Sequence, residues 1–130
     1  MAKLNFPADL KYTKTDEWIK VENGEGIIGV TDYAQDALSD VVFVELPQEG
    51  EAFKAGDAFG TVESVKAASD MHLPIGGTIT ATNKALEDTP ETVNKDPYGG
   101  GWFIKIKPTD LAELDKLMDA AAYEKYCAER

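Results

Sequence analysis

A single lysine, Lys66, lies between two stretches with strand-like composition, residues 57–63 and 67–74. Gly56 lies ten residues before Lys66 and Gly76 lies ten residues after it, so turn signals bracket the lysine symmetrically. This pattern predicts a β-hairpin with Lys66 at its tip, where the long side chain projects into solvent. A primary amine displayed in this way can be modified by one enzyme and presented to others. The alternative is an ordinary solvated turn lysine.

The remaining reactive side chains form no recognisable catalytic set. Cys127 is the only cysteine and His72 the only histidine, which argues against a disulfide framework, a cysteine metal site and a Ser-His-Asp triad. The net charge of −11 and the pI near 4.4 disfavour binding to nucleic acid and suit docking to basic rims of partner proteins. Without a long apolar run or a leader pattern, the chain is predicted to be intracellular and not to bind a membrane.

The elements that must position Lys66 are mostly short strands separated by turns, within one domain of residues 1–130 that has its core at about 10–108. Strands are predicted at residues 17–21, 26–30, 41–46, 78–82 and 102–107, with Asn23-Gly24 at the first hairpin turn. A short helix is expected over residues 33–38, capped by Thr31 or Asp32, with Gln35 completing a capping box with Asp32. Residues 85–101 are predicted to form a long ordered loop. A helical segment of about 109–129 should follow, with Leu111, Leu114, Leu117 and Met118 packed on the sheet.

Several blocks of the sequence resemble one known family. They are Leu10–Thr13, Glu17-Trp18, Gly29–Asp32 with Ala34-Gln35, Val41–Pro47, Phe59-Gly60, Val62–Ala67, Ala85-Leu86, Asn94, Asp96–Tyr98, Gly101-Trp102 and Ile104–Pro108. In this order they are similar to the H proteins of the glycine cleavage system, and the resemblance covers roughly residues 10 to 126. The block Glu63-Ser64-Val65-Lys66-Ala67 is its most specific part.

The resemblance implies a mainly β fold, the barrel-sandwich hybrid of lipoyl and biotinyl domains, with two small antiparallel sheets, a short mid-chain helix and C-terminal helices. It implies lipoic acid in amide linkage on Lys66. The family's lipoyl arm receives an aminomethyl group at the pyridoxal-phosphate glycine decarboxylase and yields it at the tetrahydrofolate-dependent aminomethyltransferase. Dihydrolipoyl dehydrogenase then reoxidises the dithiol. The resemblance therefore implies a shuttle protein rather than an enzyme, and the absence of a leader pattern predicts that it lies in the cytoplasm. A lipoyl- or octanoyl-attaching enzyme is a further implied partner.

The resemblance also implies roles for the residues around the lysine. Glu17 matches the family's glutamate before tryptophan and is expected to face the cationic amine in a cleft that shelters the loaded arm, with Asp70 as a second candidate. Glu63 is expected to serve recognition by the attaching enzyme, together with Ser64, Val65 and Ala67. For these acids the alternative is a solvated surface charge. Asp16 departs from the family, which often has histidine there, and residues 71–82 match less closely.

Three competing functions remain open at this point. A biotin carrier shares the predicted hairpin, but biotinylated lysines normally have methionine on both sides, and here the neighbours are Val65 and Ala67. An H-like protein could instead relay lipoyl groups to other enzymes. The third alternative is an unmodified interaction scaffold in which Lys66 is a turn residue only.

Overall fold

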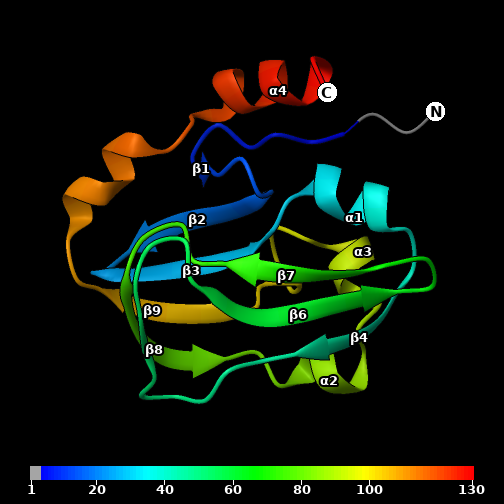
Figure 1. Cartoon of the computed structure of the whole chain (residues 1–130), viewed down its shortest axis with the longest axis horizontal. Coiled ribbons are helices and arrows are strands. Elements are labelled where there is room, and N and C mark those ends of the chain that lie inside the picture. Colours follow the sequence, from blue (N-terminus) through cyan, green and yellow to red (C-terminus); the bar gives the residue numbers. More distant parts are fainter. Residues whose placement is uncertain (1–3) are drawn as a thin grey trace.

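The computed structural model describes residues 4–130, which form two antiparallel sheets packed face to face with helices at their ends (Figure 1). The larger sheet has the strand order β1-β2-β3-β9-β8-β5, and the smaller has the order β4-β6-β7. The elements are β1 (Lys11–Tyr12), β2 (Glu17–Glu22), β3 (Glu25–Val30), α1 (Asp32–Leu38), β4 (Val41–Glu45), β5 (Ala52–Phe53), β6 (Ala58–Ser64), β7 (Ala68–His72), β8 (Gly77–Thr82), α2 (Ala85–Asp88), α3 (Thr92–Lys95), β9 (Ile104–Pro108), the 3₁₀ helix η1 (Leu111–Lys116) and α4 (Ala120–Ala128).

The two predicted hairpins are confirmed. β2 pairs with β3 across Asn23 and Gly24, whose φ angles of 53° and 79° are the left-handed pair that a tight two-residue hairpin turn requires. β6 pairs with β7 around Lys66, and this hairpin forms two of the three strands of the smaller sheet. The predicted mainly β architecture, with two antiparallel sheets, a short mid-chain helix and C-terminal helices, is therefore correct.

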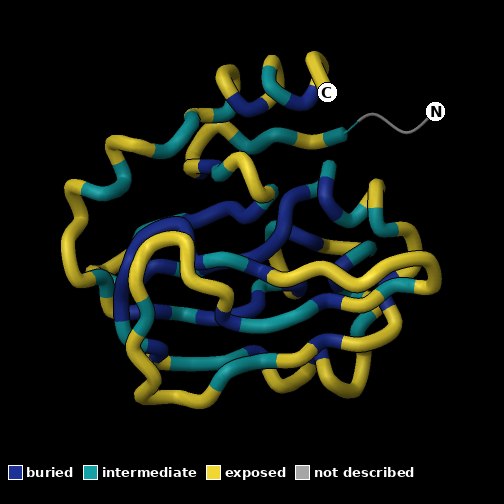
Figure 2. The backbone as a smooth tube through the Cα atoms, in the orientation of Figure 1, coloured by how far each residue is buried: buried dark blue, intermediate teal, exposed yellow. Residues whose placement is uncertain are grey.

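Two apolar clusters hold the elements together. The main core fills the space between the sheets and includes Ile28, Val62, Met71 and Ile104. A second cluster lies beneath α4, where its side chains join the helix to β1 and β2; its buried members are Leu10, Tyr12, Trp18, Tyr123 and Cys127. Figure 2 shows the buried side of α4 turned toward the rest of the chain and the β6–β7 tip exposed. Cys127 is thus a packing residue, as predicted.

The smaller sheet depends on a close approach of β4 to β6. A Cβ atom added at Gly60 would collide with the backbone carbonyl oxygen of Glu45, so only glycine fits there without moving a strand. Val44 and Val62 pair across the same two strands and are both buried. The lysine hairpin is therefore fixed to β4 along most of its length.

Three local predictions are wrong. The predicted loop of residues 85–101 contains α2 and α3, single-turn helices too short to show a helical period in the sequence. The first C-terminal helix is a 3₁₀ helix in which Leu111 is 51% exposed, while Leu114 and Leu117 are half-buried against the core. No capping box forms at α1, because Thr31 is the N-cap and the Gln35 amide donates to the Asp32 side chain.

Candidate functional site

Lys66 occupies the tight turn between β6 and β7, and its side chain is exposed. The Ser64 backbone N–H donates to the Ala67 carbonyl at 2.7 Å, which closes the turn. The Ser64 hydroxyl oxygen also accepts from the backbone N–H groups of Lys66 at 3.3 Å and Ala67 at 3.1 Å. Serine side chains often stabilise turns by such local bonds. Ser64 therefore shapes the backbone that displays Lys66, a role that the sequence did not reveal.

The turn is also tied to the segment before β4. The Val65 N–H donates to the Asp40 carbonyl at 3.0 Å, and Val41 is the register partner of Ser64. Lys66 therefore projects from a backbone that is bonded on two sides. Of the predicted recognition residues, Glu63, Val65 and Ala67 are exposed around the lysine, whereas Ser64 is half-buried.

Glu17 opens β2 and is buried, with only 1% of its surface exposed. One carboxylate oxygen accepts from the Thr13 hydroxyl at 2.7 Å and the Thr15 hydroxyl at 2.5 Å, and the other accepts from the His72 backbone N–H at 3.0 Å. Burial raises the pKa of Glu17 above its ordinary value, and these hydrogen bonds oppose that rise. The reading of Glu17 as a solvated surface acid is therefore wrong.

Glu17 and Asp70 line the same cavity, which has a volume of about 170 Å³. One wall comes from α1 through Ala34, Ala37 and Leu38, and Asp70 stands on the other wall, on β7. Asp70 follows Lys66 by four residues, which is roughly 13 Å along an extended strand. An unmodified lysine reaches roughly 6 Å from its Cα. The bare amine therefore cannot enter the cavity, whereas a longer group on the same lysine has the length to do so.

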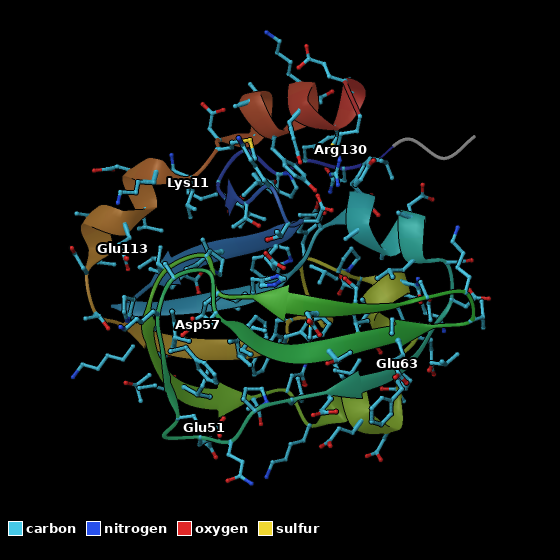
Figure 3. All side chains as sticks on the ribbon, in the orientation of Figure 1. Lys11, Glu51, Asp57, Glu63, Glu113 and Arg130 are labelled. Atoms are coloured by element: carbon cyan, nitrogen blue, oxygen red, sulfur yellow. The ribbon has the colours of Figure 1, made fainter. Side chains whose placement is uncertain are left out.

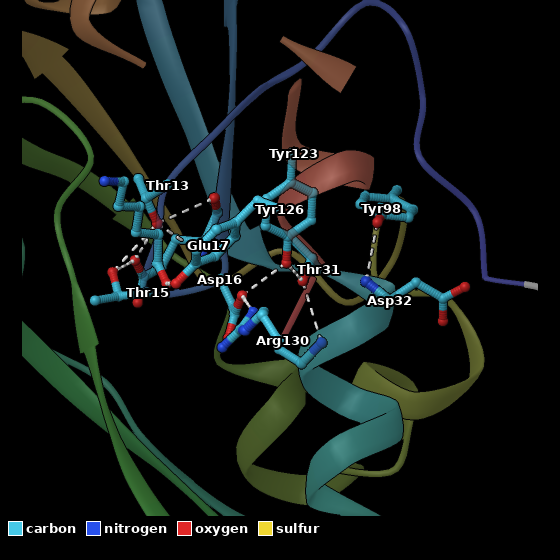
Figure 4. Close-up of polar contacts among 12 residues, drawn as sticks. Thr13, Thr15, Asp16, Glu17, Thr31, Asp32, Tyr98, Tyr123, Tyr126 and Arg130 are labelled. Atoms are coloured by element: carbon cyan, nitrogen blue, oxygen red, sulfur yellow. Dashed lines mark hydrogen bonds and ion pairs between the residues drawn. The ribbon is translucent and has the colours of Figure 1, made fainter. Parts of the chain in front are cut away.

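The C-terminal helix is hydrogen-bonded next to two parts of the cavity lining, the start of α1 and Asp16. The Tyr123 hydroxyl donates to Asp16 at 2.8 Å and lies 2.7 Å from the hydroxyl of Thr31. Thr31 caps α1, and Asp16 precedes Glu17 in a left-handed conformation with φ of 74°. Figure 4 shows Tyr123, Asp16 and Thr31 converging at this point.

Arg130 completes this cluster from the end of the chain. Its guanidinium donates to both carboxylate oxygens of Asp16, at 2.6 and 3.1 Å, and packs over the rings of Tyr33 and Tyr126. The cluster was not predicted because its members lie up to 114 residues apart. The only local sign was that Asp16 departs from the pattern of the resembled family. Asp16 therefore does not only replace the histidine that the family often has at this position. Its carboxylate also binds Arg130 and Tyr123.

Glu63 lies outside the cavity. It is paired with Phe43 on one side and Ala68 on the other, and its side chain is exposed on the outer face of the smaller sheet. Among residues 4–130, no group of three or more His, Cys, Asp or Glu side chains is arranged to hold a metal ion. No helix in the same range is long and apolar enough to span a bilayer.

Comparison with known proteins shows the family to which this chain belongs. The model of the glycine cleavage H-protein family matches residues 10–130. The glycine cleavage system H protein of Bacteroides fragilis is 53% identical over 121 residues, which is 93% of this chain and 96% of that protein. This chain belongs to the glycine cleavage H-protein family. Glycine cleavage system H protein 2 of Pseudomonas aeruginosa is 55% identical over 121 residues, covering 92% of this chain and 93% of that protein.

The H-protein fold extends to solved structures. The crystal structure of a glycine cleavage system H protein from Mycobacterium marinum superposes with a TM-score of 0.87 at 39% identity, covering 94% of this chain and 98% of that one. Membership in the H-protein family confirms the function predicted from the sequence, a lipoyl-carrying shuttle of the glycine cleavage system that is not itself an enzyme. It also disfavours the biotin carrier and the unmodified scaffold.

Proposed function

We propose that this chain carries out its H-protein role through Lys66, which becomes amide-linked to lipoic acid. The observation that carries the proposal is an exposed lysine at the tip of a hairpin, about four strand positions from a cavity with a buried carboxylate. Lipoate, when attached, supplies a disulfide that accepts a carbon group together with two electrons and can be reoxidised afterwards.

The residues present fit such a group. Lys66 is exposed, and its turn is closed by backbone and Ser64 hydrogen bonds. Within residues 4–130, no acidic side chain forms an ion pair with its amine. The cavity is too far for the bare amine but lies along the strand that leads from it. Tethering the arm at the tip of a rigid hairpin keeps its local concentration high at each docked partner.

The cavity is suited to hold a cationic group away from water. Glu17 supplies a carboxylate fixed by two hydroxyls and one backbone N–H, and Asp70 adds a second acid at the rim. Because the Glu17 side chain is almost fully buried, attraction between its carboxylate and an entering cation is stronger than between the same charges in water. Glu17→Ala should leave attachment at Lys66 unchanged but shorten the lifetime of the loaded protein, measured as faster release of formaldehyde; unchanged release would remove Glu17 from this role.

Lys66 is proposed to present the arm in turn to the pyridoxal-phosphate glycine decarboxylase, the aminomethyltransferase and dihydrolipoyl dehydrogenase. A lipoyl- or octanoyl-attaching enzyme must act first. The acidic surface, with a net charge of −11, favours partners whose docking faces have basic rims. We place the protein in the cytoplasm, the compartment in which all four partners would meet it, and cell fractionation tests this.

The test is intact-mass analysis of protein produced in lipoate-replete cells, followed by peptide mapping. Wild-type protein should carry one lipoyl adduct, located on Lys66. The matched variant Lys66→Arg keeps a solvated cation at the tip and should fold normally without acquiring the adduct. An adduct on another lysine, or none on Lys66, would refute the proposal.

A further inference from the structure

Three exposed apolar side chains lie on the lysine-bearing turn or on the strand paired with its hairpin. Four large hydrophobic residues are strongly exposed within residues 4–130, and three of them, Val42, Phe43 and Val65, lie on β4 or on the hairpin turn itself. Their exposed fractions are 53%, 48% and 67%. Single exposed apolar residues are common, but a cluster beside a functional group in so acidic a protein indicates a binding surface.

A β-bulge exposes two of these residues together. The register of β4 against β6 shifts between Val41 and Phe43, so Val42 has no partner across the strand. Regular alternation would expose only one of Val42 and Phe43, whereas here both are exposed and Val41 and Val44 are both buried. Bulges of this kind redirect side chains next to functional sites. The sequence run Val41–Val44 therefore builds an apolar surface as well as a buried strand.

Register places this surface next to Lys66. Phe43 is opposite Glu63, Val41 is opposite Ser64, and the Val65 N–H is bonded to the Asp40 carbonyl. The first residues of β4 and the tip of the hairpin therefore lie side by side and form one surface. Its exposed acids are Asp40, Glu45 and Glu63. Figure 3 shows Glu63 on the side of the molecule away from Glu113, which lies two residues from Leu111, the fourth exposed hydrophobic residue.

We propose that Val42, Phe43 and Val65 form the docking anchor for the enzyme that attaches lipoate or octanoate to Lys66, an inference that rests on the proposed function. The short reach of the lysine amine indicates the attaching enzyme as the partner that binds here. An enzyme that acts on the bare Nζ must bring its active site within roughly 6 Å of the turn backbone. Its surface must therefore cover the residues beside the turn, including Val65 and Phe43. Partners that act at the far end of a loaded arm need not approach so closely.

The chemistry of the surface defines what the enzyme must offer. An aromatic side chain flanked by two aliphatic ones, with acids at the edge, matches an interface with an apolar centre and a polar rim. The enzyme's docking face should therefore have an apolar depression bordered by arginine or lysine side chains that face Glu63 and Asp40. Phe43, as the aromatic member, should contribute most of the binding free energy.

Steady-state kinetics of attachment test the inference. Purified lipoate–protein ligase with lipoate and ATP modifies the unmodified protein, and intact mass reports the rate. Phe43→Thr, which keeps a residue suited to a strand, should raise the KM for the carrier about tenfold with kcat within about twofold, the effect of losing one aromatic anchor. Val65→Thr, nearly isosteric, should raise KM about threefold. The control Leu111→Thr removes an equally exposed hydrophobic residue far from the tip and should leave KM unchanged.

Further experiments test whether another protein, rather than the attaching enzyme, binds this surface. Phe43→Thr protein lipoylated to completion should support glycine–bicarbonate exchange with nearly wild-type KM, because the decarboxylase is not the proposed occupant. The inference would be overturned if Phe43→Thr left the KM for attachment unchanged, or if Leu111→Thr raised that KM as much. It would also be overturned if Phe43→Thr raised the KM for the decarboxylase reaction by the same factor as the KM for attachment. Sedimentation in which wild-type protein dimerises through Phe43 would also overturn it. If wild-type Lys66 is not modified at all, the proposed function fails; if it is modified and the variants match it, only this inference fails.

Discussion

Tyr123→Phe should weaken the connection between the C-terminal helix and two parts of the cavity lining, the start of α1 and Asp16, without disturbing the aromatic cluster beneath that helix. The hydroxyl makes two contacts, to Asp16 at 2.8 Å and to the Thr31 hydroxyl at 2.7 Å, and the residue is fully buried. The ring stacks on Tyr12 at a centroid distance of 4.7 Å, and phenylalanine keeps this packing. The variant therefore removes hydrogen bonds and little else.

The expected loss follows from those two bonds. A typical intramolecular hydrogen bond contributes about 1 kcal/mol net, so the free energy of unfolding should fall by about 2 kcal/mol. For a chain of this size, a loss of that amount lowers Tm by roughly 8 °C. Asp16 keeps its bidentate ion pair with Arg130, which limits the damage on that wall. Thr31 still caps α1 by accepting from the Ala34 N–H.

Urea denaturation followed by circular dichroism measures this change. The matched control is Tyr126→Phe on the same helix, whose hydroxyl makes one exposed bond of 3.2 Å to the Lys14 carbonyl and should cost less than about 0.5 kcal/mol. Amide hydrogen exchange should also rise at Asp16 and Ala34 in the Tyr123 variant but not in the control. If the two variants lose equal stability, or if exchange at Asp16 and Ala34 is unchanged, the idea that α4 holds the start of α1 and Asp16 in place is wrong.

Two other perturbations follow from the structure. Gly60→Ala would push a Cβ into the Glu45 carbonyl and should lower the free energy of unfolding by about 2–3 kcal/mol, measured by urea denaturation; a loss below about 0.5 kcal/mol would mean that β4 and β6 are not so close. Because burial raises the pKa of Glu17, the native state binds that proton more tightly than the unfolded chain, so the contribution of Glu17 to stability is complete below its ordinary pKa and falls as the pH rises through the raised value. The stability of Glu17→Gln relative to wild type should therefore improve as the pH rises from the ordinary pKa of a glutamate through the raised value, and a pH-independent difference would contradict this.

The sequence predicted features that depend on local chemistry and missed those that depend on distant contacts. The Asn23-Gly24 turn and the Lys66 hairpin follow from residues that only a few conformations accept. The burial of Glu17 could not be predicted in this way. Glu17, Trp18 and Ile19 are consecutive and all buried, so this strand lacks the alternation that is typical of a half-buried strand. Likewise Val41–Val44 has the composition of a buried strand, and only the register shift against β6 reveals that Val42 and Phe43 are exposed.

The cluster around Asp16 also could not be predicted from the sequence. Asp16, Thr31, Tyr123 and Arg130 meet only because β2, α1 and α4 pack together, and no local pattern relates these positions. α2 and α3 were missed for a different reason, since a helix of four residues has too few positions to show a period.

Glycine–bicarbonate exchange catalysed by the partner decarboxylase tests the central claim most directly, namely that this chain works through the amine of Lys66. Lipoylated wild-type protein should support exchange, whereas the unmodified protein and Lys66→Arg, taken through the same attachment reaction, should give only background rates while remaining folded. Exchange at the wild-type rate with Lys66→Arg, or with protein that carries no adduct, would contradict the account.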